Sequence, residues 1–260
     1  MKFISTLLFT ILVSAANSQV WKLSTHYSLG VPQQQMEKNI QAVHSLQVGI
    51  LYQLKHIKQL SAGIDFGIGS YASKRIEQTF QFDNNTAAIV PVNYNSNAFN
   101  VALQGRLNLL NEKYCIVPYI NAKGGLYNFF STIYIEDPTE AGGCHALEQK
   151  TIMNDKTPYW SAGGGLQIDP VIFSKTGRKG NIIIDISANT IHGGTMDYIN
   201  TKHLTDAQTV NDPDAKAVQV RFINASTQAI HEHTVAQVFT SSLRLLEFRA
   251  GVIMKLGKCN

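Results

Sequence analysis

The chain has 260 residues, of which 15% are charged, and its formal net charge is +4. This charged fraction is low against the usual quarter. The Lys and Arg residues form no basic run or recognition motif, so the sequence does not favour nucleic-acid binding. Three cysteines without a CxxC motif are too few and too scattered for a disulfide framework. The length suits one large domain or two small ones.

The first 18 residues have the features of a secretion signal. Lys2 supplies a positive charge, an uncharged apolar run extends to Val13, and Ala16-Asn17-Ser18 provides the small residues that cleavage requires. The apolar run is shorter than the roughly 20 residues that a helix needs to span a bilayer. We therefore expect residues 1–18 to be a signal peptide and residues 19–260 to form a single mature domain without a transmembrane helix.

Eight segments of the mature chain alternate apolar and polar residues. A period of two is typical of a β-strand with one apolar and one polar face. The last segment is the clearest, because apolar residues stand at every second position from Leu246 to Leu256. In chain order, the predicted strands cover residues 21–29, 45–54, 60–69, 99–108, 114–134, 159–168, 184–189 and 246–257.

The connections between these strands alternate in length. The second, fourth and sixth strands are followed by short turns, at residues 55–58, 111–113 and 174–180. The other connections are long, and the longest runs roughly from Tyr198 to Ser242. Short turns at one end and long loops at the other are typical of bacterial outer-membrane barrels, in which the turns are periplasmic and the loops extracellular.

The composition of the two strand faces separates a membrane barrel from a soluble one. The polar face is mostly Ser, Gln, Asn and Gly with single charges, which suits a narrow and filled interior. A soluble lipocalin-like barrel, the alternative, would expose a polar face dense in Lys and Glu. The sequence therefore predicts an all-β fold, an eight-stranded antiparallel up-and-down transmembrane β-barrel. Its apolar face carries the aromatic residues Trp21, Tyr52, Phe66, Phe99, Trp160 and Phe248.

This organisation resembles the outer-membrane β-barrel family of Gram-negative bacteria, specifically the small eight-stranded OmpA/OmpX-like class. The resemblance covers nearly the whole mature chain. It implies a place in the outer membrane, contact with outer-membrane lipid and insertion by the barrel assembly machinery. Many members end on an aromatic residue used in assembly, whereas this chain ends Leu256-Gly257-Lys258-Cys259-Asn260. We expect no room for a peptidoglycan-binding domain after the barrel.

Several charged residues are predicted to point into the lumen. Because single charges in a tight interior are costly, we expect them to pair and close the barrel as a structural plug. For Glu247, the expected partner is a cation of a neighbouring strand, with Lys22 and Arg249 as the leading candidates. A narrow porin-like path for solutes is the alternative. The predicted lumen charges are Lys22, Asp65, Arg106, Lys123, Asp185, Glu247, Arg249 and Lys255.

Two short motifs raise the question of chemistry. Lipid A deacylases, built on similar barrels, use a His and a Ser two residues apart, as in His26-Tyr27-Ser28. By that resemblance the pair should lie late in the chain and face the outer leaflet, whereas here it lies early and faces inward. His231-Glu232-His233 lacks a third metal ligand. We therefore expect no catalytic residues, no metal and no cofactor, and keep a lipid-A-modifying enzyme as an alternative.

The longest connection has a pattern of its own. Apolar residues alternate from Val218 to Phe222, and Val235 to Phe239 offers a return strand. We predict that the seventh and eighth strands extend beyond the membrane as a hairpin, with the acidic segment 206–214 mobile, and that this hairpin is the place for an unidentified extracellular ligand. The expected function is thus a non-enzymatic, structural or surface-binding outer-membrane protein. Cys115 and Cys259 share the turn end of the barrel, and the sequence leaves their pairing open.

Overall fold

The computed structural model describes residues 21–82, 86–136, 146–173, 181–202, 215–223 and 230–256. The predicted signal peptide, the turn at 174–180, the acidic segment 206–214 and Cys259 fall outside these ranges. The described strands are β1 (Trp21–Pro32), β2 (Val43–Gln53), β3 (Leu60–Phe82), β4 (Thr86–Asn108), β5 (Ile116–Glu136), β6 (Ala146–Ile168), β7 (Ile182–Ile199), β8 (Lys216–Ile223) and β9 (Ile230–Leu256). They are accompanied by helix α2 (Gln35–Asn39) and the 3₁₀ turn η2 (Pro170–Phe173).

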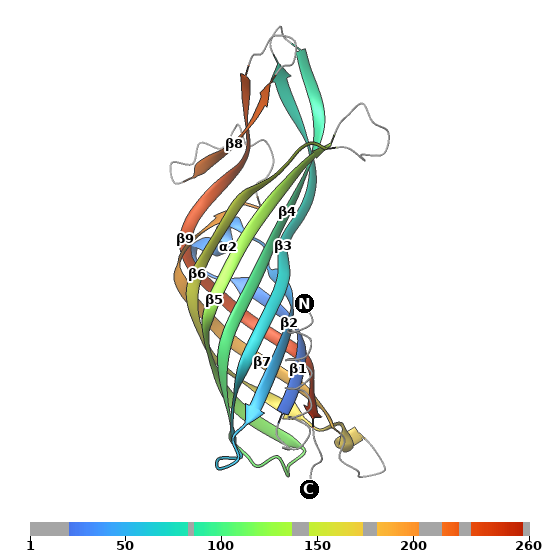
Figure 1. The fold of residues 1–260 in the computed structure, drawn as a ribbon, viewed down its shortest axis with the longest axis vertical. Helices are drawn as coiled ribbons and strands as arrows, with labels where there is room; N and C mark the ends of the chain where they lie inside the picture. Colours follow the sequence, from blue (N-terminus) through green and yellow to red (C-terminus); the bar gives the residue numbers. More distant parts are fainter. Residues whose placement is uncertain are drawn as a thin grey trace, which may run out of the picture.

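Eight of the strands close into a barrel (Figure 1). Strands β1 to β7 pair in sequence order, β7 pairs with β9, and β9 pairs with β1. Every pairing is antiparallel, and the seam places Trp21 opposite Leu256 and Leu29 opposite Phe248. Strand β8 lies outside the ring as a hairpin partner of β9. The predicted eight-stranded antiparallel up-and-down barrel is confirmed.

The strands differ greatly in length. β1 and β2 have 12 and 11 residues, whereas β3, β4 and β6 have 23 each and β9 has 27. A tilted strand needs only about 9–11 residues to span a bilayer. The long strands therefore continue well beyond a membrane-sized barrel. Much of what the sequence analysis assigned to long loops, including residues 70–82 and 146–158, is paired β-strand.

The sidedness of the long strands reverses along their length, and β4 shows this clearly. In its second half, Phe99 and Leu103 are exposed while Asn100 and Arg106 are buried. In its first half, even-numbered residues still face inward, but most are now apolar, and Val90, Val92 and Tyr94 are all buried. The barrel is thus apolar outside and polar inside at the turn end, and the reverse at the other end.

Beyond the barrel, the wall separates into two sheets. The β2–β3 pairing ends at His44 and Ser70, and the β6–β7 pairing ends at Tyr159 and Gly193. Above these points β3 to β6 form one sheet, and β7, β9 and β8 form the other (Figure 1). The two sheets enclose one apolar core that includes Val92, Tyr94, Phe129, Ile133, Met196, Tyr198, Val235, Val238 and Leu243.

Polar bonds also join the two sheets. The Tyr94 hydroxyl of β4 donates to the carbonyl of Val235 in β9, and Gln78 Nε2 of β3 donates to the same carbonyl at 3.5 Å. The seventh and eighth predicted strands correspond to β7 and β9, and they remain paired up to Ile199 and Val238, as the expected hairpin requires. Strand β8 adds a further pairing with β9 from Lys216 to Ile223. However, Val235 to Phe239 are buried between the sheets. The return strand is therefore part of the core rather than of a surface loop.

Helix α2 covers the core above the short strands β1 and β2. Its Met36 and the following Ile40 are 0% and 1% exposed within the apolar core. The carbonyl of Asn39 accepts from the backbone N–H of Thr201 at 2.8 Å, and Lys74 Nζ donates to the Thr201 carbonyl at 2.8 Å. No helix in the described part of the chain is long and apolar enough to cross a membrane.

Candidate functional site

The eight charges predicted to face the lumen all lie on the inner side of the barrel wall. Seven are buried and Lys255, near the turn end, is half-buried. They come from β1, β3, β4, β5, β7 and β9, so the strand alternation brings distant parts of the chain together. Their contacts fall into three groups along the barrel axis.

The first group is centred on Asp65 of β3. Its Oδ2 accepts from Lys123 Nζ of β5 and from Arg249 Nη1 of β9, each at 2.7 Å. Arg249 Nη2 also donates to Glu247 Oε1 at 3.0 Å, and Ser28 Oγ donates to the same oxygen at 2.8 Å. Two carboxylates thus face two cations, and the formal charge of the group is balanced.

The second group is centred on Asp185 of β7. Arg106 of β4 donates to both carboxylate oxygens, at 3.3 and 3.2 Å, and its guanidinium lies 4.0 Å from the ring centre of Tyr119. The Tyr119 hydroxyl donates to Asp185 Oδ2 at 3.0 Å, and His26 Nε2 lies 2.8 Å from the same oxygen. Four strands therefore meet at a single carboxylate, and their positions are fixed relative to one another.

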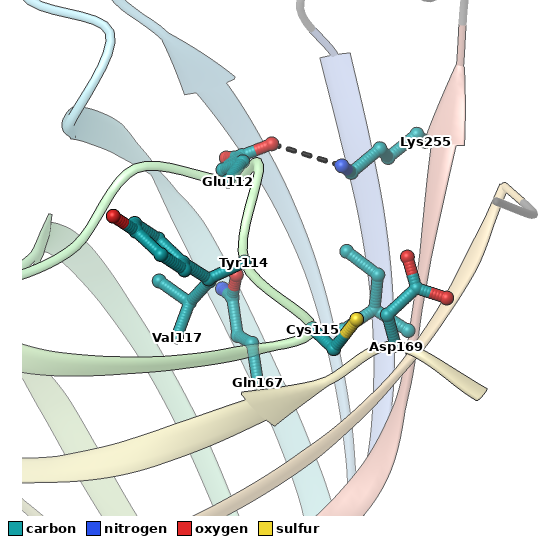
Figure 2. Close-up of a pocket in the computed structure, with 8 residues that line it drawn as sticks. Glu112, Tyr114, Cys115, Val117, Gln167, Asp169 and Lys255 are labelled. Carbon is teal, nitrogen blue, oxygen red and sulfur yellow. Dashed lines mark ion pairs between the residues drawn. The ribbon is translucent and has the colours of Figure 1, made fainter. Parts of the chain in front are cut away.

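The third group lies at the turn end and is organised by Glu112, between β4 and β5. Glu112 binds Lys22 Nζ of β1. It also binds Lys255 Nζ of β9 at 2.9 Å (Figure 2), so it joins both strands of the barrel seam. Asn108 Nδ2 and Gln53 Nε2 also donate to its carboxylate, at 3.2 and 3.3 Å. Burial raises the pKa of Glu112, but the two lysines outweigh this effect and hold it below the ordinary value.

Glu112 is the member of the charge network that sequence reasoning missed. It lies in a turn, where strand alternation gives no inward or outward direction. A signal existed nevertheless, because the predicted set of lumen charges contains five cations and only three carboxylates. Burying that imbalance is unfavourable, so a further carboxylate near Lys22 and Lys255 was to be expected.

Two specific expectations can be compared with these contacts. Of the two cations considered for Glu247, Arg249 is the one that contacts it, and it does so from the same strand. Lys22 pairs with Glu112 instead. His26 and Ser28 both face inward, but His26 is bonded to Asp185 and Ser28 to Glu247. They are held apart by different carboxylates rather than arranged as a base and its nucleophile.

The lumen is tightly filled around these groups. A methyl group placed on Gly49 would lie 2.8 Å from Ser24 Oγ and 3.0 Å from Asp65 Oδ1. One placed on Gly67 would collide with the amides of Gln47 and Asn100. At the turn end, the pocket beside Glu112 offers only about 10 Å³ (Figure 2). That space is about one water molecule.

Among the described residues, no group of three or more His, Cys, Asp or Glu side chains could hold a metal ion. The side chains of His231 and His233 lie outside the described part of the structure. Cys115 is half-buried beside the pocket at the turn end.

Aromatic and histidine rings mark both edges of the outward apolar band. At the turn end, the Trp21 and Tyr52 rings lie 5.1 Å apart. At the other edge, Trp160 stacks on His192 at 4.5 Å. Rings of this kind favour the boundary between hydrocarbon and water, because one end is apolar and the other polar. The band between them has the organisation of a membrane-facing surface.

No protein-family model matches this chain, and no curated protein matches its sequence. Solved structures with a similar arrangement include Neisserial surface protein A (NspA), with a TM-score of 0.41, 9% identity, and coverage of 90% of this chain and 96% of that chain. A major outer membrane protein from Thermus thermophilus has a TM-score of 0.42 and 8% identity, and the match covers 92% of this chain and 99% of that chain. The outer membrane protease OmpT from Escherichia coli has a TM-score of 0.32 and 10% identity, and the match covers 92% of this chain and 97% of that chain. These similarities concern the barrel architecture, and they assign neither a family nor an activity.

Proposed function

We propose that this protein is a non-enzymatic outer-membrane β-barrel with a closed lumen, and that its two-sheet extension serves as a binding surface outside the cell. The observation that carries the proposal is the reversal of sidedness along single strands. On the outward face of β4, Phe99, Leu103 and Leu107 are apolar in the barrel half, whereas Asn93, Asn95 and Asn97 are polar where the extension begins. A chain surrounded by water throughout has no physical reason to reverse in this way.

The outward band is too apolar for contact with water. Ile50, Ile68 and Leu103, on three adjacent strands, are 47%, 62% and 69% exposed. Soluble monomers rarely expose apolar patches of more than a few hundred Å², whereas here apolar residues are exposed on every strand of the ring. Lipid hydrocarbon is the environment in which this surface is stable. Outer-membrane lipid and the machinery that inserts barrels are therefore the expected partners.

The orientation follows from the unequal ends of the barrel, because the strands stop at one end and continue as the two-sheet extension at the other. The short turns would be periplasmic and the two-sheet extension extracellular, as in other barrels of this kind. Residues 1–18 would direct export and be removed. In the extension, the outward side chains of the β3–β6 sheet are mostly Asn, Ser, Thr and Gln with a few charges, which suits exposure to water.

The contents of the lumen favour a plug over a conduit. Its central charges are bonded to one another, and small side chains could not be added at Gly49 or Gly67 without collision. A solute path would need an open polar passage, and an eight-stranded barrel is only wide enough for its own side chains. The inward pair His26 and Ser28 is bonded to carboxylates inside this filled space, which disfavours a lipid-modifying enzyme.

Planar-bilayer recording tests the closed lumen. The purified protein should insert and give no steady single-channel current, while a general porin prepared in the same detergent conducts in a parallel chamber. Insertion is checked separately by resistance to SDS unfolding until boiling. Stable channels of uniform conductance would contradict the plug. Recovery of the protein from the periplasm without detergent would contradict the membrane location.

A further inference from the structure

A polar groove of about 370 Å³ crosses the outer face of the extramembrane β3–β6 sheet. Its volume lies within the roughly 300–1,000 Å³ of small-ligand sites. The groove belongs to the part of the sheet that rises above the apolar band, and it faces away from the core. The side chains used below are Arg75, Asn93, Asn95, Thr132, Tyr134 and Gln149, which all line it.

Strand register arranges these residues in two neighbouring rows. Arg75 of β3 is opposite Asn93 of β4, Asn93 is opposite Tyr134 of β5, and Tyr134 is opposite Gln149 of β6. With strands about 4.8 Å apart, this row is about 14 Å long. In the second row, Asn95 of β4 is opposite Thr132 of β5. The groove is therefore fixed by a four-stranded sheet rather than by loops.

The chemistry of the lining matches a saccharide. Asn and Gln amides both donate and accept hydrogen bonds, as sugar hydroxyl groups also do. The Tyr134 ring adds an apolar face beside a hydroxyl group. The guanidinium of Arg75 is suited to bind a phosphate in a bidentate manner. Among the described residues no carboxylate lines the groove, and its one aliphatic residue, Ile133, is 0% exposed. Among its lining residues the Tyr134 ring is therefore the apolar face that the groove offers, and amides, hydroxyl groups and cations supply the rest.

The position of the groove identifies the source of the saccharide. Asn95 lies on the same outward face of β4 as Phe99, which belongs to the apolar band. At about 3.3 Å per residue, the two are about 13 Å apart along the strand, and a strand tilt of about 35–45° reduces this to about 10 Å along the membrane normal. The headgroup region beyond the hydrocarbon is about 5–7 Å deep. The groove thus lies just above the headgroups, at the level of the sugars of a glycolipid anchored in the same leaflet.

We propose that this groove binds the phosphorylated saccharide headgroup of an outer-leaflet glycolipid. A lipid that is already anchored beside the barrel presents its sugars at a high effective concentration, which adds to the affinity that the free saccharide itself has for the groove. The proposal rests on the proposed function, because it requires the barrel to be inserted with its extension outside. It gives the binding surface a ligand class, which the proposed function leaves open.

Calorimetric titration of the detergent-purified protein tests the inference. The probes are a rough-type lipopolysaccharide and the phosphorylated core saccharide released from it by mild acid. Both should bind the wild type, and the Arg75→Ala/Asn95→Ala double variant should bind each at least fivefold more weakly. The control is Lys216→Ala, which removes an exposed cation from β8 on the other sheet. Its affinity should be unchanged.

Each other outcome overturns the inference. If the wild type binds neither probe, the groove is not a saccharide site. If the double variant binds as tightly as the wild type, the binding takes place elsewhere. Equal weakening by Lys216→Ala shows attraction by net charge rather than a built site. Binding of the intact lipid alone points to the acyl chains. Resistance of every variant to SDS unfolding confirms that it is folded. If these proteins insert and stay closed without binding saccharide, the proposed function stands and only this inference fails; if the wild type does not insert, the proposed function fails.

Discussion

Asp65 illustrates how one lumen residue stabilises the barrel. Its carboxylate is 1% exposed and bonded to cations from two other strands, β5 and β9. Taking an ion out of water costs several kcal/mol, and in this environment the cost is offset only while the partners are present. The opposite charges therefore depend on one another, and the loss of one leaves the others buried without a partner.

Asp65→Asn should destabilise the folded barrel by about 3–5 kcal/mol, because Lys123 and Arg249 lose their shared carboxylate. The measurement is the urea midpoint of reversible unfolding from lipid vesicles. Glu232→Gln is the matched control, since it breaks the exposed pair with Arg221 and should cost no more than about 1 kcal/mol. Equal midpoints for the two variants would show that the Asp65 contacts do not stabilise the fold.

Glu112 should make the stability of the seam depend on pH. Its pKa is lowered in the folded state from an ordinary value of 4.5, so its contribution is fully present above that value and is lost as the pH falls through the folded-state pKa. The difference in unfolding free energy between the wild type and Glu112→Gln should thus be constant from about pH 6 to 8 and shrink below about pH 4.5. A difference that grows on acidification would contradict the assignment.

Strand β9 shows at the level of an element how one face passes from lipid to water. Phe248, Ala250 and Val252 are exposed in the apolar band, while Thr240 and Ser242 are exposed on the extension. All five lie on one side of a single strand. The cost of a charge on this side should therefore depend on its position along the strand.

Ala250→Arg should cost about 2–4 kcal/mol, because the charge enters the hydrocarbon. Ser242→Arg places the same residue on the same face of the same strand, eight positions away, and should change stability by no more than about 0.5 kcal/mol. Unfolding midpoints in vesicles measure both. If Ser242→Arg is as harmful as Ala250→Arg, the boundary of the membrane does not lie between these two positions.

Strand alternation predicted the barrel half of each element but not the extension, and β4 shows why. The even-numbered residues face inward throughout, yet most of them are polar in the barrel half and apolar in the extension. The polar ones are Asn100, Gln104, Arg106 and Asn108, and the apolar ones are Val90, Val92 and Tyr94. The hydrophobic pattern therefore reverses phase within one strand, and a search for a continuous apolar face ends there. In β3 an irregularity between Ser70 and Ala72 adds a shift of register.

For the lumen, alternation gave the direction of each charge but not its partner. Asp65 meets side chains of β5 and β9 rather than those of its pairing neighbours, β2 and β4. Which side chains share one height depends on strand tilt and stagger, which the local sequence does not encode. For the same reason, the sequence did not predict the contact between Tyr94 and Val235, which belong to two separate sheets.

At the scale of the whole molecule, the apolar band is bounded by the two tryptophans of the chain. Trp21 lies on the outward face of β1 at the turn end, and Trp160, 56% exposed, lies on the outward face of β6 at the other edge. The molecule thus carries its own fluorescent reporters of depth, one for each membrane interface.

Trp21→Phe and Trp160→Phe each leave a single tryptophan. In vesicles of lipids brominated at different depths, we expect both proteins to be quenched more strongly by shallow than by mid-chain bromines, because both rings lie near an interface. An aqueous quencher added outside the vesicles should reach the remaining tryptophan in only one of the two variants. The same quencher enclosed inside the vesicles should reach it only in the other variant. Strongest quenching at the bilayer centre for either ring would contradict the placement of the band.

The seam between β1 and β9 has a consequence for the order of assembly. Hairpins such as β3–β4 join residues that are close in sequence, whereas the seam joins Trp21 to Leu256 across almost the whole described chain. Closing the longer loop costs more chain entropy, so the hairpins should form first and the seam last. Until then, the edges of β1 and β9 expose backbone groups that hydrocarbon cannot satisfy. We therefore expect any factor that inserts this protein to shelter these two edges until they meet.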